Sequence, residues 1–92
     1  MIDLKVTYQE LDEVLQLLKF SKSRDEKGLI YSYPPLETEI KLRMPKSAQE
    51  VVNGGILSGH AFILEQKGVI TKANVLYRII ENQRFIKENV LV

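Results

Sequence analysis

The chain has 92 residues, which predicts a single domain spanning residues 1–92, and its 45% hydrophobic and 27% charged content is typical of a globular protein. It contains no cysteine, which excludes disulfides and thiolate chemistry, and its formal net charge of +1 disfavours a dedicated nucleic-acid binder. The sequence shows no secretory signal and no apolar run near the roughly 20 residues of a membrane span, so we expect a soluble, cytoplasmic protein.

The first part of the chain predicts a strand followed by a helix. Residues 2–8 alternate between apolar and polar side chains, which is the period of a half-buried strand. Thr7 and Glu10 have the Thr-x-x-Glu spacing of a capping box, so we expect a helix to begin there and to end near Phe20. The polar segment 21–28 is expected to be a loop.

Two further strands are predicted in the middle of the chain. Residues 29–33 (LIYSY) are short and aromatic-rich, and the two prolines after them cannot continue a ladder of backbone hydrogen bonds. From residue 36 to 44 apolar and charged side chains alternate, which predicts a strand with one wet face in an antiparallel sheet. Tyr31 and Tyr33 share one face of the first strand, where they could stack nucleic-acid bases or pack against a neighbouring strand.

The second half of the chain predicts two helices. Ser47 and Glu50 repeat the capping-box spacing, so we expect a helix from there to Gln66. A third helix is expected from about residue 72 to 87, because its apolar side chains pair at i, i+1, i+4 and i+5 and do not alternate. The alternative is a hairpin formed by residues 75–92.

These elements predict an α+β domain of order β-α-β-β-α-α, in which a mostly antiparallel sheet is covered by helices on one face. If the C-terminal segment is instead a strand, the order becomes ferredoxin-like, β-α-β-β-α-β.

Three glycines lie inside the second predicted helix, in the stretch VVNGGILSGHAF. Each costs about 1 kcal/mol relative to alanine in a helix interior, so a compensating interaction is expected. Gly55 and Gly59 stack on one side of the helix and predict a close-packed contact with another backbone. The opposite side carries Leu57, His60 and Leu64, so the helix is apolar on two sides. The second side could meet the third predicted helix, or it could meet another copy of the protein, and we expect a homodimer.

Asn53-Gly54 is also a strong turn dipeptide, which leaves a second interpretation of the same stretch. In it the helix stops at Val52 and restarts near Ile56. Backbone N–H groups at the restart would then point outward and could hold an anion.

The same stretch resembles the Gly-Gly helix start of hot-dog fold thioesterases. The resemblance covers about a dozen residues and implies an acyl ligand bound at Gly54 and Gly55. Two positions depart from that family's pattern: Phe62 stands where an acidic residue often takes part in catalysis, and Asn53 stands where a histidine often precedes the glycines. The chain after the helix is also too short for the long strands that wrap a hot-dog helix.

Side chains suited to catalysis or metal binding are sparse. His60 is the only histidine, and Ser58, two residues away, points elsewhere on a helix. Glu37 and Glu39 share a strand face with basic residues, which predicts a solvated charged face and not an acid–base pair. We therefore predict no catalytic residues, no metal and no cofactor, and hence no enzyme.

The sequence thus predicts a small non-enzymatic interaction or regulatory protein that binds a protein partner or itself. The candidate interaction residues are Gly55, Gly59, Leu57, His60, Leu64, Tyr31 and Tyr33. The alternatives are a nucleic-acid-binding accessory protein, suggested by the basic residues between 67 and 87, and an acyl-ligand binder that uses Gly54 and Gly55.

Overall fold

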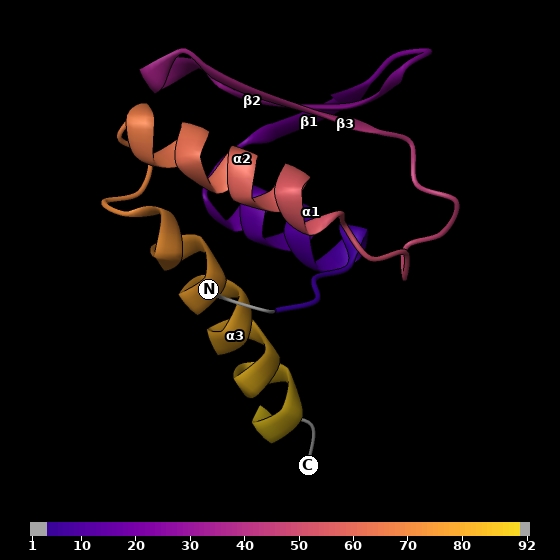
Figure 1. Ribbon diagram of the computed structural model, residues 1–92, viewed down its shortest axis with the longest axis vertical. Helices are drawn as coiled ribbons and strands as arrows, with labels where there is room; N and C mark the ends of the chain where they lie inside the picture. Colours follow the sequence, from indigo (N-terminus) through magenta and orange to yellow (C-terminus); the bar gives the residue numbers. More distant parts are fainter. Residues whose placement is uncertain (1–3, 91–92) are drawn as a thin grey trace.

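The computed structural model describes residues 4–90, which form a three-stranded antiparallel sheet and three α-helices (Figure 1). The α+β class expected from the sequence is confirmed, although the order of elements differs from the prediction. The elements are α1 (Tyr8–Leu17), β1 (Ser21–Arg24), β2 (Gly28–Tyr33), the 3-10 turn η1 (Pro34–Leu36), β3 (Thr38–Arg43), α2 (Gly54–Gln66) and α3 (Ala73–Val90).

The sheet is a simple meander of order β1-β2-β3. Its buried side chains follow the alternation of the sequence, and in the β2–β3 register Leu29 is opposite Leu42 and Tyr31 is opposite Ile40. These side chains face the helices, which lie on one side of the sheet in Figure 1. The core is completed by residues of all three helices, including Leu11, Leu15, Leu57, Leu64, Leu76 and Ile80.

The prediction of a strand over residues 2–8 is wrong for the residues that the structure describes. Residues 4–6 have no regular secondary structure, and Thr7 makes only an isolated bridge with Val51. Hydrogen bonds from Val52 N to Val6 O and from Tyr8 N to Glu50 O hold this segment against the chain before α2. The contact is too short to form a strand, because α1 begins directly after it. Residues 1–3 lie outside the described range.

The prediction of a loop over residues 21–28 is also wrong, because residues 21–24 form β1. All four residues of β1 are exposed, and an edge strand of this kind lacks the apolar alternation that marks a half-buried strand. The turn that follows is closed by the Asp25 carboxylate, which accepts hydrogen bonds from the main-chain N–H groups of Lys27 and Gly28.

The first capping box is confirmed. Thr7 Oγ1 accepts a hydrogen bond from Glu10 N at 3.1 Å, and the Glu10 side chain accepts one from Thr7 N at 3.0 Å. The helix ends three residues before the expected Phe20, because Lys19 has the left-handed φ of 74° that terminates helices.

The second predicted capping box, at Ser47 and Glu50, is wrong. The Glu50 carboxylate instead accepts hydrogen bonds from Lys46 N and from the Arg43 guanidinium, and α2 does not begin until Gly54. Asn53 caps α2: its Oδ1 accepts from Gly55 N at 2.9 Å and from Ile56 N at 3.2 Å. The turn expected at Asn53-Gly54 is therefore the start of the helix.

The helix predicted in the C-terminal part is confirmed as α3, so the hairpin and the ferredoxin-like order are wrong for residues 73–90. The Arg84 guanidinium binds the Glu10 carboxylate of α1 and the Lys5 carbonyl, and Lys87 pairs with Glu13. These contacts tie the last helix to the first.

Candidate functional site

Helix α2 carries most of the predicted interaction residues, and the structure divides them between the core and the surface. Leu57 and Leu64 are buried in the hydrophobic core together with Ala61. They face the sheet and α3 and do not contact solvent, so these two leucines are not available to a partner of the folded chain.

Gly55 and Gly59 lie on the exposed side of α2. The predicted close packing against another backbone is absent within the described chain. A Cβ at Gly59 would meet no atom of the described residues within 4 Å, and one at Gly55 would meet only Asn53 Oδ1 at 3.2 Å. The reason is the late start of the helix. Gly54 and Gly55 fall in its first turn, where the cap places them at the surface, and only Gly59 is an interior glycine.

Large apolar side chains flank these glycines. Ile56 is 44% exposed, Phe62 is 56% exposed and Ile63 is 36% exposed. The sequence has no Asp, Glu, Lys or Arg from Gly54 to Leu64. We call Ile56, Gly59, Phe62 and Ile63 the α2 surface. A solvent-facing side of a helix normally carries charged and polar residues, so the apolar composition of this surface is unusual.

His60 borders the α2 surface and is half-buried against the sheet. Its ring lies beside the Lys41 main chain of β3, but neither ring nitrogen has a hydrogen-bond partner among the described residues. Burial lowers the pKa of His60 from its usual 6.5, an effect that the Lys41 main chain partly offsets. The imidazole is therefore neutral at pH 7.

Of the two predicted tyrosines, Tyr31 is buried and Tyr33 is partly buried against the core. Tyr31 is 0% exposed and donates its hydroxyl to Asp12 Oδ1 at 2.7 Å, while the Tyr33 ring packs on Phe20 with 5.4 Å between ring centroids. Burial, with the Asp12 carboxylate second, raises the pKa of Tyr31. Because Tyr31 is buried, it is not available to stack on a base, and packing is the interpretation that its surroundings favour.

A cleft that the sequence did not reveal opens between α1, β1 and the segment after β3. It has a volume of about 350 Å³ and is lined mainly by Tyr8, Leu29, Tyr31, Met44 and Pro45, with Asp12, Lys22 and Arg24 as its charged residues. The Asp12 carboxylate is already engaged by Lys22 Nζ at 2.8 Å and by the Tyr31 hydroxyl. These partners are far apart in the sequence, so no spacing pattern could have indicated the cluster.

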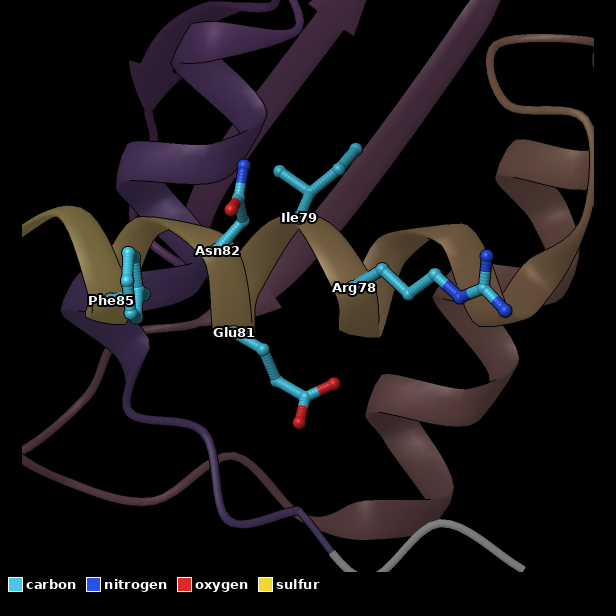
Figure 2. Close-up of a pocket in the computed structure, with 5 residues that line it drawn as sticks. All are labelled: Arg78, Ile79, Glu81, Asn82 and Phe85. Atoms are coloured by element: carbon cyan, nitrogen blue, oxygen red, sulfur yellow. The ribbon is translucent and has the colours of Figure 1, made fainter.

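The outer face of α3 carries a shallow hollow of about 550 Å³ (Figure 2). Figure 2 shows Ile79 and Asn82 pointing to one side of the helix and Glu81 to the other, while Phe85 is 64% exposed. The hollow is lined by one cation and one anion, Arg78 and Glu81, and its lining contains no serine, threonine, cysteine, lysine or histidine.

The basic residues of the C-terminal part are not gathered into a free patch. Arg84 and Lys87 face carboxylates of α1, and the Arg84 guanidinium is the main reason that the pKa of Glu10 is lowered to about 2. Two of the basic residues near the end of the chain thus pair with acidic residues near its start.

Comparison of the chain with known protein families, with characterised proteins and with solved structures found no match. Within residues 4–90 no group of three or more His, Asp or Glu side chains is arranged to hold a metal ion. No helix in that range is long and apolar enough to cross a membrane.

Proposed function

We propose that the chain is a non-enzymatic protein-interaction domain that contacts a protein partner through the α2 surface. The observation that carries the proposal is the combination of exposure and composition on this helix. Three large aliphatic or aromatic side chains are exposed on a stretch of 11 residues, 54–64, that contains no Asp, Glu, Lys or Arg. Covering such a surface removes apolar area from water at about 25 cal/mol per Å², which favours association.

The position of Gly59 in the helix also supports the proposal. A solvent-exposed glycine in a helix interior destabilises the helix by about 1 kcal/mol relative to alanine, and here no contact within the described chain offsets that cost. Its missing side chain lets the backbone of another helix approach closely. A partner that uses this approach would supply the compensation that the isolated chain lacks.

The nucleic-acid alternative has less support from the structure. Two of its basic residues, Arg84 and Lys87, already bind α1 carboxylates, and Tyr31 is buried. The acyl-ligand alternative also has less support, because the Gly55 N–H at the start of α2 already donates to the Asn53 cap.

Site-specific photo-cross-linking in the source cells tests the proposal. A photoreactive amino acid would replace Phe62, and a matched control would replace Glu26, which is exposed in the β1–β2 turn. We expect a discrete protein adduct from position 62 that is lost when Ile63→Glu is added, and none from position 26. Equal adducts from both positions, or none from position 62, would contradict the proposal.

A further inference from the structure

Strand β3 is an edge strand with an open side. Among residues 4–90 it pairs only with β2, and its outward side chains Glu39 and Lys41 are exposed. An open edge presents unpaired backbone N–H and C=O groups that can receive another strand. We propose that two copies of this chain pair through β3 in an antiparallel arrangement, so that two three-stranded sheets become one six-stranded sheet. The inference rests on the proposed interaction function and names the partner as a second copy.

The charge pattern of β3 is complementary to itself when it is read in opposite directions. In the register that places Ile40 opposite Ile40 of the second copy, Glu39 lies opposite Lys41, and Lys41 lies opposite Glu39. Both directly opposed charged pairs are then of opposite sign, and opposite-charge cross-strand pairs stabilise an antiparallel ladder. Within one copy Lys41 Nζ lies 3.5 Å from Glu39 Oε1, and both side chains are largely exposed and free to change partner.

Neighbouring registers are disfavoured by the same residues. A shift of two residues in one direction places Lys41 opposite Lys41, although Glu39 then lies opposite Arg43, and a shift in the other direction places Glu39 opposite Glu39. Among these three registers, only the one centred on Ile40 has no like charges directly opposite one another, and like charges in that position destabilise the pair. A shift of one residue would put the buried face of β3 beside the wet face of its copy, and the helices of the two copies would then lie on opposite faces of the sheet. The pattern thus favours the register centred on Ile40.

The other edge of the sheet lacks this property. Strand β1 has four residues, and its two charged side chains, Lys22 and Arg24, are both positive. A short edge whose charged side chains are both cationic, one of them paired with Asp12, offers no opposite charge to a second copy of itself, and shortness is a common protection against strand addition. Self-pairing therefore favours the β3 edge over the β1 edge.

Part of the α2 surface lies on the same side of the molecule as the β3 edge. The Glu65 side chain accepts a hydrogen bond from Ala73 N at the start of α3, at 2.7 Å, which places that side of α2 toward α3. His60, on the other side of the helix, lies beside β3. Ile56 and Ile63 are four residues before and three residues after His60, so they share its side of the helix.

Pairing of the two β3 strands would therefore bring the two α2 helices toward each other across the two-fold axis. Ile56, Gly59 and Ile63 would provide the contact, and Gly59 has no side chain to keep the backbones apart. The neutral His60 adds no repulsion between the copies at pH 7. A strand of 6 residues and a helix of 13 residues each span about 20 Å. That is the scale of a small specific interface, so we expect a concentration-dependent dimer.

Sedimentation equilibrium of the purified full chain, from micromolar to near-millimolar concentration, tests the inference with charge-reversal variants. The wild type should dimerise, and Glu39→Lys and Lys41→Glu should each weaken the dimer about tenfold or more, because each variant places only like charges opposite one another. An equimolar mixture of the two variants should dimerise again, because every opposed pair in the mixed dimer is of opposite sign. Lys27→Glu, which makes the same charge change in the β1–β2 turn, should dimerise like the wild type.

Circular dichroism of each variant would verify that the exposed substitutions leave the fold intact. A wild type that stays monomeric over the whole range would overturn self-pairing. A dimer that persists in both single variants, or a mixture that fails to recover, would overturn pairing through β3. The cross-linking experiment separates these failures from failure of the proposed function, because an adduct at position 62 with the mass of a different protein would keep the α2 surface as an interaction site.

Discussion

At the residue scale, two glycines have opposite surroundings. Gly28 begins β2 in close contact with the end of β3, and a Cβ added there would collide with the Leu42 carbonyl oxygen and lie 2.9 Å from Arg43 Cα. Both obstacles are main-chain atoms of a paired strand, which cannot move without breaking the ladder. Gly59 has open space around it within the described chain. The same substitution should therefore have opposite effects at the two positions.

We expect Gly28→Ala to lower the free energy of unfolding by about 2–4 kcal/mol, through the clash and the forced change of backbone. Gly59→Ala should raise it by up to about 1 kcal/mol, because alanine favours a helix interior and the new methyl group meets nothing. Urea unfolding at low protein concentration, where self-association is weakest, measures both values. A destabilised Gly59→Ala variant would show that this glycine is packed in the folded monomer after all.

His60 makes stability depend on pH in a defined direction. Burial lowers its pKa in the folded chain below 6.5, so the unfolded chain takes up a proton first as the pH falls. The stability that the neutral imidazole contributes to the folded chain is therefore fully present above about pH 6.5. It is lost as the pH falls from there toward the lower pKa of the folded state.

Urea unfolding of the wild type and of His60→Gln between about pH 7.5 and about pH 5 would isolate this effect. As the pH falls below about 6.5, the free energy of unfolding of the wild type should fall relative to that of His60→Gln. A difference that stays constant with pH would contradict the assignment of a lowered pKa to His60.

At the element scale, the start of α2 shows how two similar cap signals are told apart. Ser47 and Glu50 have capping-box spacing, but the Glu50 side chain is held by Arg43 and by Lys46 N, and no helix follows. Asn53 lies directly before the helix, and its side-chain oxygen accepts hydrogen bonds from two main-chain N–H groups. Only the second residue should contribute as a cap.

We expect Asn53→Ala to lower the free energy of unfolding by about 1 kcal/mol through loss of the cap. Ser47→Ala is the matched control and should change it by less than about 0.5 kcal/mol, because the Ser47 side chain is exposed and lies outside any helix. Thermal or urea unfolding measures both. An equal loss in the two variants would indicate that the 47–50 segment has the structural role of a cap.

At the scale of the whole molecule, the ends of the described chain are joined by charge. Glu10 completes the cap of α1 with Thr7 and at the same time binds Arg84 of α3, with 2.8 Å between Oε1 and Nη2. Its pKa falls from 4.5 to about 2 in the folded protein, chiefly because of Arg84. The stability that this carboxylate contributes is present above about pH 4.5 and is lost as the pH falls toward 2.

We expect Glu10→Gln to lower the free energy of unfolding at neutral pH by about 1–2 kcal/mol, a value reduced by the partial exposure of the pair. The variant should lose less stability than the wild type when the pH is lowered from about 5 to about 3. Glu13→Gln is the control, because its pair with Lys87 is more exposed and should matter less. Parallel acid unfolding curves for Glu10→Gln and the wild type would contradict the role of Glu10.

How much the sequence could predict depended on the range of the interactions. The Thr7–Glu10 capping box, the alternation of β3 and the helical spacing of α3 were predicted correctly. In each of these, the residues that carry the signal lie within a few positions of one another. The α2 surface was only half predicted: the unusual composition of the 51–62 stretch was recognised, but the side of the helix that faces the core was not.

The sequence by itself determined the start of α1, the strands β2 and β3 and the helix α3, and hence the α+β class, although the alternation over residues 2–8 and the spacing of Ser47 and Glu50 were equally local and misled. Only the tertiary structure decided that residues 21–24 join β2 as an edge strand and that residues 4–7 do not form a strand, because strand formation requires a partner that is distant in the sequence. It also decided that Leu57 and Leu64 lie inside while Ile56 and Phe62 lie outside. In a helix that is apolar on two sides, the sequence of the helix alone does not determine which side is buried. The positions of the sheet and α3 determine it.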